Sequence, residues 1–459
     1  MFNKFLNWIR GVIKKMLDKG TIKKQFNVDV NISDKMAKSI ELWSKMFENK
    51  SPWLDDKTQS LNLAATIANE VARLVTLELE SEISGSKRAD YLNEVYQDFL
   101  ESIRHYVEYG CGKGGAIFKP YISNGDMAIE VIQANKFYPT EYDNRGKMTG
   151  VIFVSQKIDG NVFYTRLEYH RFIGEVYVID NIAFKSNSKD MLGDQVSLAE
   201  VPEWASIDPR TVIQDLEQPL FSYFKVPFAN QIDPESPLGV SVFSRAVDLI
   251  KEADKQYSRI LWEYEGSELA IDADASVLQN DEINKKLKLP HLKDRLFRSV
   301  GNTKDGDFYE VFSPSIRDVS LFNGLDKLLK KIEFACGLAY GTISDPQTVD
   351  KTATEVKQAR QRSYANVADI QTALQKALDD LIYAVDALAS LYELAPAGEY
   401  EISYKWDDSI IVDAEIERKQ DIQDVGLGVM SKEEYRAKWY GETIEQAREN
   451  LPQQADVIE

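Results

Sequence analysis

The sequence predicts an α+β fold that is mainly helical, and three patterns in its 459 residues support this prediction. Through most of the first third and the second half, apolar residues recur every three or four positions, which is typical of amphipathic helices. Between residues 116 and 185, short runs rich in Val, Ile, Tyr and Phe alternate with turn sequences, which indicates antiparallel strands. From residue 353 to residue 394 an apolar stripe continues without a break, so we expect one helix about 60 Å long.

Three helices are expected before the β region, over residues 34–47, 61–79 and 89–109, and the third should end at Gly110 and Gly112. Residues 1–17 also show helical spacing, but Lys and Arg interrupt their apolar face and exclude the apolar core of a signal peptide. We expect this basic segment to dock on the protein itself or on a partner, with a membrane surface as the alternative. No apolar run approaches the roughly 20 residues that a membrane span needs.

Turn sequences divide the β region into hairpins. They lie at 123–125, 143–146 and 159–161, and each combines Gly with Asn or Asp, as tight turns between strands require. Residues 186–220 are polar and contain Pro, so we expect a long connection there. One more strand is expected over 221–227.

Helices return in the second half, around a small mixed segment. Ser241 is expected to cap a helix that begins at Val242 and ends near Gly266. After it the sequence predicts, in order, short strands around a basic stretch (267–316), a helix (318–340), a loop (344–351), the long helix, a strand (400–405) and two acidic helices (413–424 and 431–440).

The charge is strongly acidic and uneven. The formal net charge is −19, which argues against a general nucleic-acid-binding protein, because such proteins are basic. Residues 353–459 contain 22 Asp and Glu against 11 Lys and Arg, a net charge of −11. A short basic patch stands out against this background between residues 285 and 298, where Asp294 is outnumbered by Lys285, Lys286, Lys288, Lys293, Arg295 and Arg298.

No pattern typical of a catalytic or metal site is present in the sequence. Cys111 and Cys336 form no CxxC pair and are expected to be reduced, buried thiols, and the three histidines lie too far apart to predict a zinc site. The stretch GCGKGG at 110–115 lacks the spacing and the Ser or Thr of a phosphate-binding loop, so we expect a helix end there. The acidic pairs at 272–274 and 379–380 lack nearby partner ligands, although spacing leaves open an all-carboxylate site built from distant residues. We therefore predict no enzyme, no cofactor and no metal.

Two stretches carry a resemblance to a known family. They are SPLGVSVFSRAVDLIKEADKQYSRI at 236–260 and DKTATEVKQARQRSYANV at 350–367, and KTATEV is the most specific part. With the charged helix start at 1–17 and the order helix, basic insert, helix, loop, very long helix, the chain resembles the portal proteins, or head-to-tail connectors, of tailed phages of Gram-positive hosts.

The resemblance implies an architecture and a function. Portal proteins form a ring, in relatives of twelve subunits, at one capsid vertex, and double-stranded DNA passes through it during packaging and ejection. The implied partners are the terminase motor, head-completion or adaptor proteins, the major capsid protein and the scaffolding protein, with no membrane. The chain would be made in the cytoplasm of a bacterial host. Its implied parts are N-terminal helices and a β-rich wing (1–240), two stem helices (241–266 and 318–343), a clip (267–317), a tunnel loop (344–354), the long helix (353–394) and an acidic crown (395–459).

A DNA channel places opposite demands on acidic and basic residues. Each phosphate that a Lys neutralises releases counterions and tightens binding, so a channel that conducts DNA should be acidic overall, with few cations. We expect brief DNA contacts from residues of the loop and of the two stem helices, although a solvated helix face is the alternative for each lysine. These residues are Gln347, Thr348, Asp350, Lys351, Thr352, Lys251, Lys255, Lys330 and Lys331.

The basic patch at 285–298 has two interpretations. It docks an acidic adaptor surface, or it surrounds the exit through which DNA leaves. Leu287, Leu289, Leu292 and Phe297 lie among the charges, which favours a protein interface with an apolar centre. Two alternatives to the portal hypothesis remain at this point: a DNA-processing enzyme, which the missing phosphate loop disfavours, and another capsid-interior or scaffolding protein.

Overall fold

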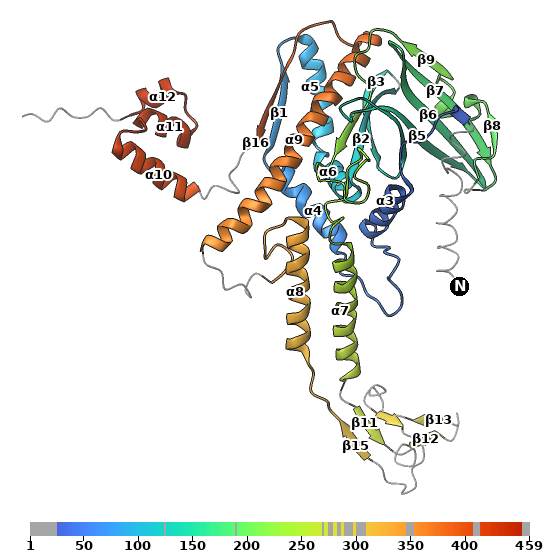
Figure 1. The fold of residues 1–459 in the computed structure, drawn as a ribbon, viewed down its shortest axis with the longest axis vertical. Coiled ribbons are helices and arrows are strands. Elements are labelled where there is room, and N and C mark those ends of the chain that lie inside the picture. The colour runs from blue at the N-terminus through green and yellow to red at the C-terminus, as the bar shows by residue number, and fades with distance from the viewer. Residues whose placement is uncertain are drawn as a thin grey trace, which may run out of the picture. The chain divides into compact units, whose positions relative to one another are not determined.

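The computed structural model describes residues 25–123, 125–188, 191–268, 270–273, 279–281, 286–288, 297–299, 309–345, 353–406 and 414–451, and Figure 1 shows them as a ribbon. The chain divides into two compact units. The first contains the chain up to Thr76 together with Glu82–Ile402, and the second contains Leu77–Ser81 together with Ser403–Glu459. Helices and strands are mixed in the described residues, which confirms the α+β prediction.

The N-terminal helices of the first unit are α3 (Asp34–Phe47), α4 (Leu63–Thr76), α5 (Lys87–Leu100) and α6 (Ile103–Lys113). The first two predicted helices are confirmed. The third is wrong, because Ser102 has φ −107° and ψ 6°, which interrupts the helix between α5 and α6. The segment predicted as a basic helix at 1–17 lies outside the described residues.

The end of α6 also differs from the prediction. Gly110 and Gly112 lie inside the helix rather than after it, and a Cβ on either would lie 2.6 Å from the ring of Phe224 or of Phe47. These glycines therefore allow close packing. The helix ends one turn later at Gly114, whose φ of 93° is the left-handed conformation that favours glycine. The expectation that GCGKGG is a helix end and not a phosphate loop is confirmed.

The β region forms two sheets (Figure 1). One has the order β10-β2-β3, and the other has the order β4-β5-β6-β7-β8 with β9 also paired to β7, all antiparallel. The three predicted turns join β2 to β3, β4 to β5 and β5 to β6, and the strand predicted at 221–227 is β10. The bounds are β2 Gly115–Ser123, β3 Asp126–Gln133, β4 Phe137–Tyr142, β5 Met148–Asp159, β6 Val162–Ile173, β7 Val176–Ser186, β8 Asp194–Val196, β9 Arg210–Ile213 and β10 Ser222–Lys225.

Three of these strands were not predicted. β4 contains Pro139 and an irregular register with β5, and it lies at the edge of its sheet, where a strand tolerates proline. β8 and β9 lie within 186–220, so the prediction of a plain connection there is wrong. Both strands are only three or four residues long and pair with β7, whose position the local sequence does not reveal.

A buried group of charged and polar side chains joins the two sheets. Glu168 of β6 accepts hydrogen bonds from Lys119 of β2 at 2.8 Å and from Arg166 at 2.9 Å, and His170 Nε2 lies 2.8 Å from its other oxygen. His170 Nδ1 lies 2.8 Å from the hydroxyl of Tyr177, which accepts the N–H of Leu220. A neutral His170 that donates from Nε2 and accepts at Nδ1 satisfies the whole chain of bonds.

This group predicts loss of stability in mild acid. Burial lowers the pKa of His170 below its ordinary value, so as the pH falls through about 6.5 the unfolded chain takes up a proton before the folded chain does. Burial alone would raise the pKa of Glu168, but Lys119, His170 and Arg166 together hold it well below its ordinary value, so Glu168 stays charged in this range. Thermal unfolding measured from pH 7.5 to 5 should therefore show a falling melting temperature. His170→Gln should flatten that fall, whereas the matched control His105→Gln, at an exposed position, should not.

The second half of the first unit contains two long helices, a set of short strands and one very long helix. The helix predicted from Val242 begins instead at Val247, because Ser241 binds the N–H of Phe243 in a turn that precedes α7 (Val247–Gly266). The next predicted helix, α8 (Asp318–Cys336), ends earlier than expected, at Gly337, which has φ 72°. Between them lie β11 (Ala270–Ala273), β12 (Gln279–Asp281), β13 (Lys286–Lys288), β14 (Phe297–Ser299) and β15 (Tyr309–Phe312).

The very long helix is confirmed as α9 (Ala353–Leu391), 39 residues. Its predicted stripe is buried against the chain's own elements, because Leu374, Leu378, Leu381 and Val385 are almost inaccessible and α9 packs on β10, β2, α4 and α5. Figure 1 shows α9 (orange) crossing the first unit beside these elements. The part of this helix from Ile370 to Ala389 is thus packed on elements of its own chain.

The second unit, described by itself, is a small group of helices that follows β16 (Glu401–Trp406), which pairs with β1 (Leu79–Ser84). It contains α10 (Ala414–Leu427), α11 (Lys432–Tyr440) and α12 (Ile444–Glu449). Asp421 of α10 accepts bonds from Trp439 at 2.8 Å and pairs with Lys438 at 2.7 Å, which joins α10 to α11. The predicted strand and both acidic helices are confirmed. In the residues that were searched, no helix is both long and apolar enough to cross a membrane.

Candidate functional site

Helices α7 and α8 lie side by side and form what we call the helix pair (Figure 1). Arg317, just before α8, binds both carboxylate oxygens of Glu263 near the end of α7, at 3.0 and 2.7 Å. Nearer the start of α7, Gln256 donates to the carbonyl of Leu321 on α8 at 3.3 Å. These contacts show that the helices run antiparallel, so the start of α7 and the end of α8 share one end of the pair.

One face of α7 holds the segment between α3 and α4. Asp254, which is buried, accepts hydrogen bonds from the indole of Trp53 at 2.9 Å and from the N–H of Leu61 at 2.8 Å. The hydroxyl of Ser258 accepts the N–H of Gln59 at 2.8 Å. Burial raises the pKa of Asp254, although both of its hydrogen bonds lower it. Asp254 therefore attaches the N-terminal part of the chain to the helix pair.

The four lysines predicted on the helix pair are divided between its two helices, with Lys251 and Lys255 on α7 and Lys330 and Lys331 on α8. Lys251 and Lys255 are four positions apart and share one face of α7. Lys255 forms an ion pair with Glu252 at 2.7 Å, and Lys330 forms one with Asp326 at 2.6 Å. Lys331 is exposed on α8. The Lys255–Glu252 pair is the more exposed of the two, and pairs of that kind contribute about 0–1 kcal/mol.

The other predicted site residues are placed only in part. Gln347, Thr348, Asp350, Lys351 and Thr352 lie outside the described residues, as do Lys285, Lys293 and Arg295. Lys286 and Lys288 lie on β13, and Arg298 lies on β14. β13 pairs with β12, whereas β14 pairs with β11. The described residues of the basic patch therefore belong to two different sheets.

Sequence reasoning missed the acidic residues that hold the helix pair in place. Asp254, Glu263 and Glu333 are all buried on faces that are otherwise apolar. The sequence spacing could have revealed two of these residues as part of an apolar helix face. Asp254 follows Ile250 by four positions, and Glu333 follows Leu329 by four. A carboxylate on an apolar stripe indicates a fixed hydrogen-bond partner, because an unpaired buried charge is costly.

Large apolar side chains are exposed where α7 ends and α8 begins. Trp262 is 67% exposed, Val319 70% and Phe322 46%. The ring of Tyr264 also lies here, 6.5 Å from that of Phe322. Soluble monomers seldom leave so many large apolar side chains together in water, and such groups mark surfaces that bind protein.

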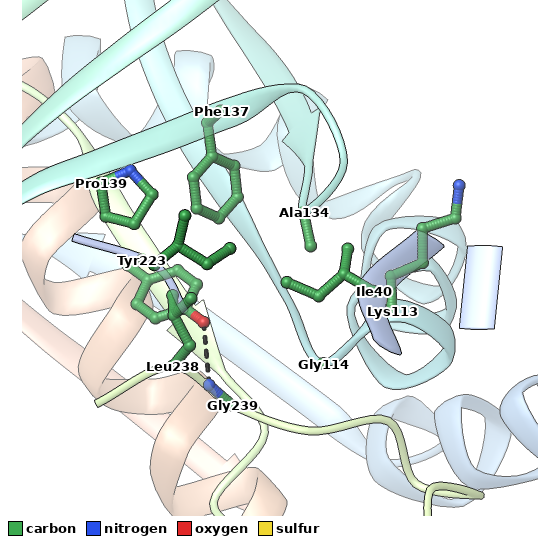
Figure 2. Close-up of a pocket in the computed structure, with 10 residues that line it drawn as sticks. Ile40, Lys113, Gly114, Ala134, Phe137, Pro139, Tyr223, Leu238 and Gly239 are labelled. Atoms are coloured by element: carbon green, nitrogen blue, oxygen red, sulfur yellow. Dashed lines mark hydrogen bonds between the residues drawn. The ribbon is translucent and has the colours of Figure 1, made fainter. Parts of the chain in front are cut away.

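A small pocket lies between α3, the end of α6 and β4 (Figure 2). It has room for about one water molecule. Tyr223 Oη accepts the N–H of Gly239 at 3.2 Å on one side, and the Lys113 amine points away from the pocket and donates to Gln133 at 2.6 Å. Burial lowers the pKa of Lys113 to about 8. The pocket is too small to hold a substrate.

The described residues offer little for catalysis. The part of the chain that was searched contains no group of three or more His, Cys, Asp or Glu residues able to hold a metal ion. Burial raises the pKa of both thiols, that of Cys336 to about 12, which disfavours the reactive thiolate. Of the acidic pairs noted in the sequence, Asp380 is paired with Lys147 at 2.8 Å.

Comparison with known proteins assigns the chain at the level of a family. Residues 22–455 match the model of the family described as phage portal protein, SPP1 Gp6-like. No curated protein matches the chain. The family match includes the helix pair, both β sheets, α9 and nearly all of the second unit.

Proposed function

Because the chain belongs to the SPP1 Gp6-like family of phage portal proteins, we propose that copies of it form a closed ring of twelve at one capsid vertex and conduct DNA during packaging and ejection. The chain is a phage portal protein, and portal proteins are structural rather than enzymatic. The ring, its subunit number and the path of the DNA are parts of the proposal.

The observation that carries the ring proposal is the exposure of large apolar side chains near the end of α7 and the start of α8, namely Trp262, Tyr264, Val319 and Phe322. In the described residues, the buried stripe of α9 already packs on its own chain, whereas these four side chains each remain at least 41% exposed. In a ring, every subunit makes the same contact with its neighbour. Apolar side chains at that contact would therefore be buried by the neighbouring subunit in every copy.

The proposal assigns each part of the chain to a part of the portal. α7 and α8 act as stem helices, β11–β15 as the clip, the connection at 344–354 as the tunnel loop, and residues 395–459 as the crown. The clip residues Lys286, Lys288 and Arg298 would face an adaptor protein of the tail. The terminase motor, the capsid and scaffolding proteins and double-stranded DNA complete the set of partners. We place the phage among those of Gram-positive hosts and the synthesis of the chain in the bacterial cytoplasm.

Negative-stain electron microscopy of the purified full-length chain tests the ring directly. The expected result is particles with a central hole of roughly duplex width in views down the axis, and a mass in solution of many subunits. A chain that stays monomeric at high protein concentration would contradict the proposal.

The proposed tunnel loop gives a second expected result. Lys351→Glu places a negative charge where brief contact with DNA phosphates is proposed, so packaging or retention of DNA should fall while rings still form. Nuclease-resistant DNA per particle measures the first effect, and microscopy of the rings measures the second. If assembly itself fails, residue 351 belongs to a subunit contact rather than to the channel.

A further inference from the structure

Three consecutive backbone N–H groups after α8 are held by two carboxylates of that helix. One oxygen of Glu333 accepts the N–H of Ile343 at 2.7 Å and of Ser344 at 2.9 Å, and the other accepts the hydroxyl of Ser344 at 2.8 Å. Asp326 accepts the N–H of Asp345 at 3.0 Å. Asp326 and Glu333 are seven positions apart and share one face of α8. Residues 343–345 therefore turn back and run along α8 toward its start.

The Glu333 contacts are buried, so the carboxylate depends on protein groups for its hydrogen bonds. The Glu333 side chain is inaccessible to water and Ser344 is nearly so. A buried carboxylate is stable only when its oxygens accept hydrogen bonds, and here two N–H groups and one hydroxyl supply them. Asp326 is positioned in turn by its ion pair with Lys330. If residues 343 and 344 leave α8, the buried Glu333 carboxylate loses the donors of three hydrogen bonds.

The same end of α8 is also bonded to α9. The carbonyl of Gly337 accepts a hydrogen bond from the side-chain amide of Asn366 at 3.2 Å. Gly337 has a φ of 72°, and a Cβ there would collide with the Asn366 amide. Only glycine satisfies both the backbone conformation and this close approach. The end of α8 thus contacts the segment that follows it and, through Asn366, the next helix.

We propose that Glu333 and Asp326 form a clamp that holds residues 343–345 on α8, with Glu333 as its main positioning residue, and that Asn366 joins the same end of α8 to α9. The functional part of this inference rests on the proposed portal function. In a ring, residues 343–345 would then move together with α8, and the bond from Asn366 to Gly337 would join that movement to α9. Loosening it should therefore impair DNA packaging without preventing ring assembly.

Hydrogen–deuterium exchange of the full-length chain tests the clamp without any assumption about DNA. In Glu333→Ala, the amides of residues 343 and 344 should exchange about tenfold faster or more, because their acceptor is lost. Glu333→Gln should show a smaller increase, since the glutamine oxygen can still accept both N–H groups. Amides of β6 and β7 should be unchanged, which shows that the fold is intact. The matched control is Glu252→Ala, which removes an exposed glutamate of α7.

Unchanged exchange at residues 343 and 344 in Glu333→Ala would overturn the clamp. Should that variant not fold, Ser344→Ala provides a milder comparison, because it removes only the hydroxyl that donates to Glu333 and accepts the N–H of Gly341. The second measurement is nuclease-resistant DNA per particle, which we expect to fall several-fold in Glu333→Ala and to recover in part in Glu333→Gln. Normal packaging together with fast exchange would overturn the functional part. If the unmodified chain forms no rings, the ring proposal is contradicted. The exchange measurement would still test the clamp, because it does not depend on ring formation.

Discussion

Replacing Trp262 by glutamate is expected to convert rings of this protein into monomers or small oligomers. Trp262, on α7, is 67% exposed in a single chain. Burying such a side chain at each subunit boundary would contribute about 2–4 kcal/mol, and a charge there would carry a desolvation cost in addition. The loss corresponds to a roughly 30- to 1,000-fold weaker contact. Mass photometry or sedimentation of the purified chain over a range of concentrations measures the outcome.

Two controls separate a specific contact from a general loss of apolar surface. Trp262→Phe keeps an aromatic side chain and should retain most of the ring. Ile158→Glu changes an apolar side chain on β5 with a similar exposure of 60%, and we expect it to leave assembly unchanged. Rings that persist unaltered in Trp262→Glu would show that the contact between subunits lies elsewhere.

Replacing Arg88 by alanine is expected to lower the free energy of unfolding by about 3–5 kcal/mol. The Arg88 side chain is only 2% exposed and links α5 to the end of α9. Its guanidinium donates to the carboxylate of Asp386 at 2.6 Å, to the carbonyls of Asp386 and Ala395 at 2.7 and 2.8 Å, and to the hydroxyl of Ser390. Alanine leaves all of these acceptors without their donor and opens a cavity.

Urea unfolding at fixed protein concentration measures this effect, since any assembly makes stability depend on concentration. Arg88→Lys should recover part of the loss, because lysine restores the charge but not the planar arrangement of donors. Arg73→Ala is the matched control. Arg73 pairs with Glu70 at the surface of α4, and its removal should cost at most about 1 kcal/mol. Equal losses for Arg88→Ala and Arg73→Ala would contradict the role assigned to the buried guanidinium.

The sequence by itself determined the features that depend on near neighbours in the chain. The apolar stripe of α9 and the hairpin turn at Gly160 follow from local spacing and turn chemistry, and both are present. Ion pairs within one helical turn can also be predicted from the sequence, because their members are three or four positions apart. Lys255 lies three positions after Glu252, and Lys330 lies four positions after Asp326. The family resemblance, carried by residues 236–260 and 350–367, agrees with the family match.

Only the tertiary structure decided which distant groups meet. Arg88 forms a hydrogen bond with Asp386, almost 300 positions away in the sequence, and Lys119 forms one with Glu168 on another sheet. The short strands β8 and β9 are both paired with β7. Periodicity reports which face of a helix or strand is apolar, but it carries no information about which element covers that face. A buried carboxylate such as Glu333 can therefore be recognised in the sequence as unusual, whereas its partners are determined by how the chain returns to it in space.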